Sequence, residues 1–211
     1  MRGLDGGERA ALLISECQRA MVDPELARLE GLARQVRDRR MLANIAGLAA
    51  ACRAAGLPVV HCTIVPRADF AGTAVSCKLM ALVRRGPLRA GSPAADIDPA
   101  VAPEPGDFVI ERQHGLTSFH GTELESVLRV RRIETVILTG VSTNVALPGT
   151  AIEAVNRGFT VVLPEDCTAG ATADAHAFMV AETLPLLATV STAAEVAAAV
   201  SGRQGPVSQQ E

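Results

Sequence analysis

Short apolar runs alternate with longer segments of helical periodicity along most of the chain. Six of these runs predict strands, at residues 10–15, 58–64, 108–111, 134–140, 159–164 and 188–191. The segments between them predict helices, at residues 24–55, 122–132, 146–157, 173–187 and 192–200. Because strands that alternate with helices run parallel, the pattern predicts an α/β fold: a three-layer α/β/α, Rossmann-like sandwich around a six-stranded parallel sheet.

The pattern also predicts how the chain is divided. Residues 1–9 are expected to form an N-terminal tail, residues 10–201 a single domain and residues 202–211 a flexible C-terminal tail. Residues 65–107 interrupt the alternation with many Gly, Pro and Ala residues, and we expect them to form the lid or wall of a pocket. Two helices open with the capping-box pattern, at Thr122/Glu125 and Thr192/Glu195.

Composition narrows the classes of partner. The net charge of −3 does not indicate a basic surface that would bind a nucleic acid. No apolar run approaches the roughly 20 residues that cross a bilayer. The start of the chain lacks the apolar core of a secretory signal. The five cysteines are odd in number and form no C-x-x-C pair, which is typical of reduced thiols. We therefore expect a cytoplasmic protein without nucleic-acid or membrane partners.

Candidate chemistry gathers where three predicted strands end. Ligands of open parallel sheets bind beyond the carboxyl ends of the strands. Glu16 follows the first strand, Arg112 the third, and the fourth runs into the turn at residues 140–146. No G-x-G-x-x-G follows the first strand, no phosphate-binding loop is present, and the histidines lack metal-site spacing. We expect neither a cofactor nor a metal.

The segment at residues 136–154, VILTGVSTNVALPGTAIEA, carries the most specific motif. It resembles the isochorismatase-like hydrolase family, also called the cysteine hydrolases, whose motif is G-V-T-T-N-V-C-V-x-x-T-A-x-x-A. The alignment places Ala146 at the family's catalytic cysteine. The resemblance covers residues 10–191 and implies that Ser142 and Ala146 supply backbone N–H groups to an oxyanion hole, with a cis peptide bond between Val141 and Ser142.

The other family motifs also differ from this chain at their reactive residues. ALLISECQ at residues 11–18 matches A-L-L-V-I-D-M-Q, so Glu16 stands at the catalytic Asp and Gln18 at the motif's Gln. Before TSFHGTEL at residues 117–124, the family Lys falls at Arg112, or at Gln113 when counted strictly back from Phe119. Arg binds carboxylates in bidentate fashion but relays protons poorly. The alternatives are a solvated strand-end carboxylate at Glu16 and a structural ion pair at Arg112.

Neighbouring residues complete the expected site. We expect the substrate pocket to include Gln18, His114, Phe119, Thr143 and Asn144. His114 is placed in the pocket by its position in the loop before Phe119, although a lone loop histidine is more often exposed and idle.

Two functions follow from these residues. The first is a hydrolase that acts on a small carboxylate-bearing substrate without a cysteine nucleophile. In it, Glu16 is the acid, Arg112 the anion clamp, and the N–H groups of Ser142 and Ala146 the oxyanion-type donors. The alternative is an inactive relative that serves as a small-molecule binding or protein-assembly module. The resemblance also implies a homodimer or homotetramer.

Overall fold

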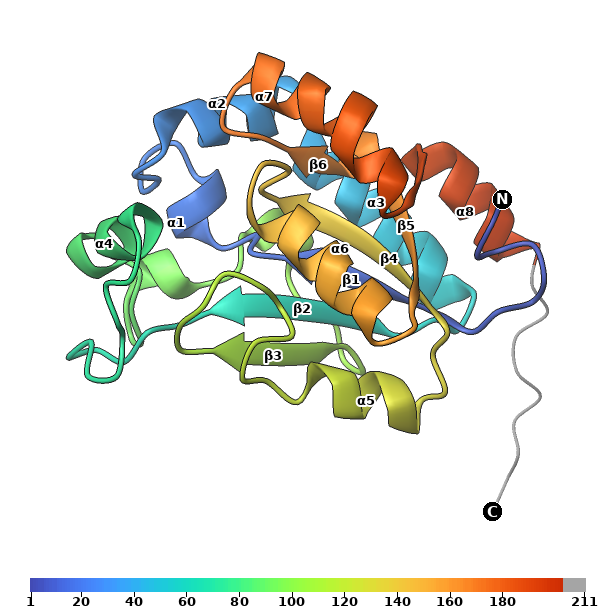
Figure 1. Ribbon diagram of the computed structural model, residues 1–211, viewed down its shortest axis with the longest axis horizontal. Coiled ribbons are helices and arrows are strands. Elements are labelled where there is room, and N and C mark those ends of the chain that lie inside the picture. Colours follow the sequence, from blue (N-terminus) through green and yellow to red (C-terminus); the bar gives the residue numbers. More distant parts are fainter. Residues whose placement is uncertain (203–211) are drawn as a thin grey trace.

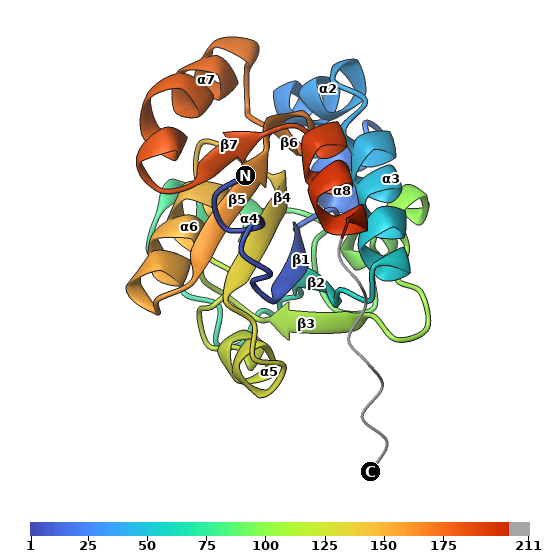
Figure 2. The same cartoon turned by 90° about the vertical axis from the view of Figure 1, so that its right-hand side faces the viewer.

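The computed structural model describes residues 1–202, which form a twisted parallel sheet covered by helices on both faces (Figures 1 and 2). The main path of the sheet has the order β3-β2-β1-β4-β5-β7, and all of its strand pairs are parallel. The strands on this path are β1 (Ala10–Ser15), β2 (Val59–Ile64), β3 (Phe108–Arg112), β4 (Thr135–Val141), β5 (Thr160–Pro164) and β7 (Thr189–Ser191). The predicted six-stranded parallel α/β fold is confirmed.

A seventh, two-residue strand was not predicted. β6 (Thr168–Ala169) pairs in parallel with the end of β4 and lies off the main path. Two residues are too few to show a hydrophobic pattern, so this strand leaves no sequence signal.

Two apolar layers hold the helices against the sheet. On one face lie α2 (Glu30–Asp38), α3 (Met41–Ala54) and α8 (Ala193–Ser201), which pack through buried residues such as Leu32, Ile45 and Val196. On the other face, α5 (Leu124–Val130) and α6 (Ala146–Asn156) pack through Leu128 and Ala151. Residues of the central strands β1 and β4 are buried on both faces of the sheet, so these strands are apolar along nearly their whole length, whereas the edge strand β3 exposes Val109 and Glu111.

The predicted helix at residues 24–55 is wrong as a single element. Within this range the chain instead forms α2 and α3, and the short helix α1 (Arg19–Val22) precedes it. Arg40 separates α2 from α3 in the left-handed conformation, with a φ of 54°. One residue in this conformation ends the regular hydrogen-bond ladder, whereas the apolar periodicity continues through it.

The two predicted capping boxes have different outcomes. At α8, the hydroxyl of Thr192 accepts a hydrogen bond from the backbone N–H of Glu195, and the Glu195 carboxylate accepts one from the N–H of Thr192, so this box is confirmed. At α5 the prediction is wrong, because the helix begins one residue late and Glu123 is the N-cap. Glu125 instead forms an ion pair with Arg157.

The end of the chain and its beginning also depart from the pattern. The helix expected at residues 173–187 is α7 (Ala173–Phe178), continued by a π-helical turn (Met179–Thr183) and a 3-10 turn (Leu184–Leu186). The first nine residues are not a free tail, since Leu4 is buried and the carbonyl of Gly3 accepts a hydrogen bond from Thr135. Of the expected C-terminal tail, residues 203–211 lie outside the described part of the chain.

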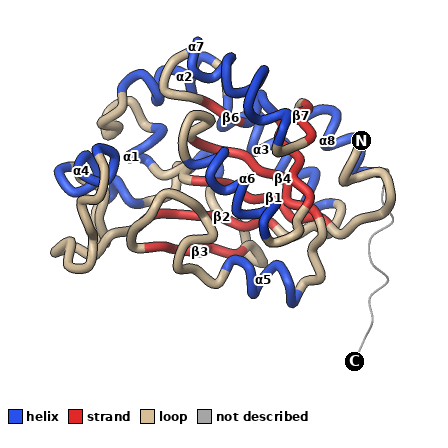
Figure 3. Tube along the Cα trace, in the orientation of Figure 1, coloured by secondary structure: helices blue, strands red, loops and turns tan. Residues whose placement is uncertain are grey.

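The long connection between β2 and β3 leaves the sheet at the carboxyl end of β2 and returns past α3 to the opposite edge, where β3 begins. It contains α4 (Lys78–Arg85) and two short 3-10 turns (Pro93–Ala95 and Pro99–Val101). Figure 3 shows this connection leaving β2 and forming, with α4, one side of the carboxyl edge. Within residues 1–202, no helix is long and apolar enough to cross a membrane.

Candidate active site

The strand order places three chemically distinct chain segments at one edge of the sheet. β1 lies between β2 and β4, and β3 lies one strand further out. Ser15 pairs with Gly140 on one side and with Cys62 on the other, while Ile64 pairs with Arg112. The residues that follow these pairs therefore meet above the same carboxyl edge.

Glu16 is the first residue after β1, and Arg112 is the last residue of β3. The backbone N–H of Glu16 still bonds to the carbonyl of Cys62, at 2.8 Å, but its φ of 53° turns the chain out of the strand. The Glu16 residue is 9% exposed and the Arg112 residue 3% exposed. Both charged side chains are therefore enclosed at the top of the sheet rather than solvated.

The two charges form a buried ion pair. Nη2 of Arg112 donates to Oε1 of Glu16, and Nε of Arg112 approaches the carbonyl of Gly115 at 3.5 Å. The remaining nitrogen, Nη1, is buried without any hydrogen-bond partner among the described residues. A buried guanidinium nitrogen without an acceptor is costly, because its lost hydration is not replaced. Arg112 thus has one unused donor group in the interior.

The two positions considered for the family Lys differ in where their side chains lie. Gln113, the alternative position for the family Lys, is exposed, whereas Arg112 points inward to Glu16.

The turn between β4 and α6 forms the next wall of the site. The peptide bond between Val141 and Ser142 is cis, as the resemblance implied. The carbonyl of Ser142 accepts hydrogen bonds from the N–H groups of Val145 and Leu147, at 3.2 and 3.1 Å. α6 then begins at Ala146, so the N–H groups of its first turn have no partner within the helix.

Gly140 allows this turn to lie directly against β1. Its φ is +99°, and a Cβ atom added there would lie 2.0 Å from the carbonyl oxygen of Ser15. Only glycine permits this approach, which brings the turn beside Glu16.

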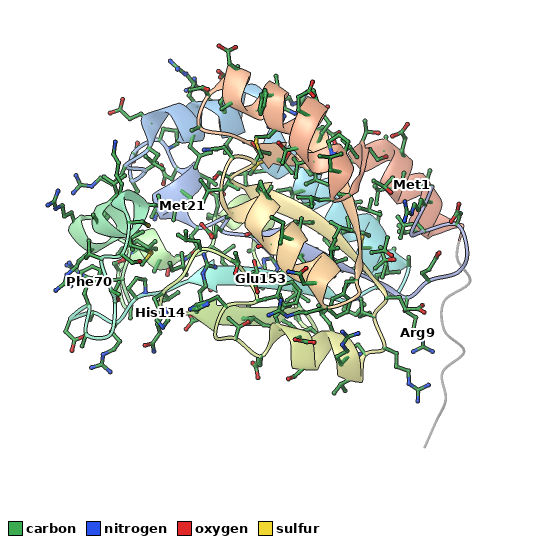
Figure 4. All side chains as sticks on the ribbon, viewed as in Figure 1. Met1, Arg9, Met21, Phe70, His114 and Glu153 are labelled. Carbon is green, nitrogen blue, oxygen red and sulfur yellow. The ribbon has the colours of Figure 1, made fainter. Side chains whose placement is uncertain are left out.

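These groups enclose a cavity of about 40 Å³. Its polar lining comes from Glu16, Arg112 and Ser142, and Ala146 also contributes to the wall. The remaining lining residues come from α1, α2 and α4, from the ends of β2 and β4, and from the adjoining loops: Met21, Leu29, Leu32, Ile64, Leu79, Met80, Val83, Gly115, Leu116, Val141 and Val145. Figure 4 shows Met21 and His114 at this edge of the molecule.

A larger cleft, of about 950 Å³, lies at the opposite edge of the sheet and contains none of the candidate residues. Arg9, at its rim, is labelled far from Met21 in Figure 4. Size alone does not identify the site, because the smaller cavity is the one where buried charged groups converge.

The five residues expected in the substrate pocket do not line the cavity. The side chain of Gln18 is fully buried and fastens the long connection, since its amide bonds to both backbone groups of Ile64 and to the carbonyl of Ala95. His114 is exposed, and its ring lies against that of His120, with 5.1 Å between the ring centroids. Phe119 is buried beneath α6, where it stacks on Phe159.

Thr143 and Asn144 support the turn from outside. The N–H of Thr143 donates to the carbonyl of Ala169 at 2.9 Å, and the side chain of Asn144 accepts from the N–H of Ala171 at 3.0 Å. Both residues therefore fix the turn to β6 and the segment after it instead of facing the cavity.

His176, which the sequence analysis did not assign to the site, also supports the turn. It is buried on α7, and its Nδ1 lies 3.2 Å from the hydroxyl oxygen of Thr143. Its Nε2 lies 3.5 Å from a carboxylate oxygen of Glu165, which is also paired with Arg39. Burial, followed by the nearby Arg39 charge, lowers the pKa of His176. The sequence signal was a histidine near the start of a helix, which is too common to single out.

The comparisons place these features in a family. The isochorismatase domain model matches residues 10–195, so the chain belongs to the isochorismatase family. An uncharacterized isochorismatase family protein from Escherichia coli O157:H7 is 35% identical over 162 residues, covering 72% of this chain and 80% of the relative. Maleamate amidohydrolase from Pseudomonas putida is 32% identical over 136 residues, covering 62% of this chain and 61% of the relative.

Solved structures agree with the fold. A cysteine hydrolase from Pseudomonas syringae pv. phaseolicola superposes with a TM-score of 0.85 at 24% identity, covering 95% of this chain and 96% of that one. An isochorismatase family protein from Burkholderia thailandensis superposes with a TM-score of 0.75 at 31% identity, covering 91% and 95% of the two chains. The chain is therefore similar to hydrolases of this family in both sequence and architecture.

Proposed function

We propose that this protein is a hydrolase that acts on a small carboxylate-bearing substrate without a covalent enzyme intermediate. The observation that carries the proposal is the convergence of Glu16, Arg112, Ser142 and Ala146 on one enclosed cavity. Arg112 points inward, which is the orientation that binding of an anion requires. Membership in a family that includes amidohydrolases supports hydrolysis as the class of reaction.

The residue at the motif's cysteine position shapes the proposed mechanism. Ala146 has no nucleophilic atom, so the reaction must use water directly. Arg112 binds the carboxylate of the substrate through its unpaired Nη1, and the turn at Ser142 and Ala146 presents N–H groups to a developing negative charge. Glu16 lies beside both groups and transfers the proton.

An enol ether illustrates a reaction that these groups can perform. Glu16 in its acid form gives a proton to the terminal alkene carbon, and the adjacent carbon becomes an oxocarbenium ion. Water adds to that carbon and loses a proton, which restores the acid form of Glu16. Collapse of the resulting hemiketal breaks the C–O bond and releases a ketone and an alcohol.

The second candidate is an inactive relative that binds a small molecule or assembles with protein. The Glu16–Arg112 pair favours it, because the two charges neutralise one another without a substrate. The small volume of the cavity also limits what can enter.

Turnover separates the two candidates. A panel of small enol ethers and amides that bear a carboxylate is incubated with the protein, and products are followed by mass spectrometry. We expect hydrolysis of at least one substrate, reduced about 100-fold or more in Glu16→Gln because the proton donor is lost. The control is Glu182→Gln, a substitution of an exposed glutamate outside the site. No turnover by the wild type across the panel would contradict the hydrolase proposal and leave the binding protein.

A further inference from the structure

The lining of the cavity contains few charged residues. Of the residues that line it, only Glu16 and Arg112 are charged, and they cancel one another. The unpaired Nη1 of Arg112 is the one buried side-chain nitrogen of the lining without an acceptor in the described chain. The Arg112 guanidinium therefore has one side-chain donor without a partner, but the lining has no second positive charge that could balance an added anion.

The elements around the cavity supply no further charge to its lining. On α1, Arg19 forms an ion pair with Asp23, and neither residue lines the cavity. On α4, Lys78 and Arg84 lie outside the lining, which receives Leu79, Met80 and Val83 from this helix.

Two thiols lie near Glu16 and stay neutral. Cys62 belongs to β2, and burial raises its pKa to about 11. Burial also raises the pKa of Cys17, with Asp98 and Glu16 adding to the effect. Neither thiol carries charge near neutral pH, so Glu16 and a bound anion would face one another with Arg112 alone between them.

A bound carboxylate would add a second negative charge to the cavity. With Nη2 held by Glu16 and Nη1 taken by the ligand, two negative charges share one guanidinium inside mostly apolar walls. Carboxylates that share a desolvated site do not both remain ionised, and the pair binds a proton as a unit.

We propose that the cavity takes a compact monocarboxylate with an apolar body, and that binding draws one proton from solvent onto the pair formed by Glu16 and the ligand. The inference rests on the ligand site of the proposed function, and it supplies the protonated Glu16 that the acid step requires. A volume of about 40 Å³ accommodates on the order of three water-sized groups, which favours a ligand near the size of propionate. A dianion or an amino acid would bring a charge for which the lining has no partner.

Titration calorimetry with propionate tests the inference on the full chain. Binding is measured at pH 6.0 in two buffers of different ionisation enthalpy, MES and Bis-Tris, and the difference in heat gives the number of protons taken up. We expect at least half a proton per bound propionate. Propionamide, which is neutral and of the same shape, should bind at least tenfold more weakly and take up none.

Matched variants locate the proton. Glu16→Gln should bind propionate without proton uptake, whereas Glu182→Gln should behave as the wild type does. Proton uptake that persists in Glu16→Gln would overturn the assignment. The wild type also decides the proposal without any variant, because binding without uptake, or no binding of propionate, contradicts it.

The outcomes also separate this inference from the proposed hydrolysis. Propionate binding with proton uptake, in a protein that hydrolyses nothing in the panel, would leave the inference standing and contradict the hydrolase proposal. Turnover together with propionate binding that takes up no proton would overturn the inference alone.

Discussion

Replacing Arg112 should lower the stability of the folded protein far more than replacing an arginine at the surface. In Arg112→Met the methionine fills part of the same space, but the Glu16 carboxylate is left enclosed without its cation. Breaking a buried ion pair by removing one partner costs about 3–5 kcal/mol. For a domain of this size each kcal/mol lowers the melting temperature by roughly 2–4 °C, so we expect a fall of roughly 6–20 °C.

A double-mutant cycle shows whether this loss belongs to the pair. Glu16→Gln/Arg112→Met removes both charges, and its free energy of unfolding should recover by at least about 1.5 kcal/mol relative to the sum of the single losses. The four proteins are compared by urea denaturation at pH 7. Arg19→Met is the matched control, because Arg19 pairs with Asp23 in a more exposed position and should give a much smaller loss.

Two outcomes of these measurements would contradict the buried ion pair. If Arg112→Met loses no more stability than Arg19→Met, or if the losses at Glu16 and Arg112 are additive, the two charges do not form the buried pair on which the site depends.

Three further predictions concern the turn, the cysteine position and the buried histidines. Gly140→Ala should lower the free energy of unfolding by more than about 3 kcal/mol, because the added Cβ meets the Ser15 carbonyl in a backbone conformation that favours glycine; an unchanged urea midpoint would contradict this. Ala146→Cys should hydrolyse the amides of the panel no faster than the wild type does, since Glu16 and Arg112 do not reproduce the family's Asp and Lys; faster amide hydrolysis in the variant would show that the thiol alone was missing. Burial lowers the pKa of His61 and His176, so below the ordinary imidazole value of 6.5 the unfolded chain binds protons that the folded chain does not. Stability should therefore be intact above pH 6.5 and fall on acidification by up to about 1.4 kcal/mol per pH unit for each histidine, with a shallower slope in His176→Gln; urea midpoints that stay constant between pH 7.5 and 5.5 would contradict it.

The parallel sheet was predictable because its signal is local. Apolar runs such as residues 134–140 mark buried strands whatever surrounds them, and observed β4 differs by one residue at each end. The convergence of Glu16 and Arg112 followed from their positions at strand ends. Their direct pairing did not, because it depends on β3 lying two places from β1 and on the inward turn of the arginine.

The pocket walls were hard to predict for the opposite reason. Residues within the motif, such as Thr143 and Asn144, bond outward to the segment around Ala169 and Ala171. Many wall residues instead come from α1, α2 and α4, whose apolar residues carry no chemical signature and reach the cavity through packing between distant segments. His176 was missed for the same reason, since its partner Thr143 lies 33 residues away in the sequence.

A crystal structure of the protein soaked with propionate tests the claim that the cavity around Glu16 and Arg112 binds an anion. We predict density for a carboxylate within about 3 Å of Nη1 of Arg112, with its apolar end toward Met80 and Leu116. A cavity that stays empty at saturating propionate, or propionate bound only elsewhere on the molecule, would contradict the claim.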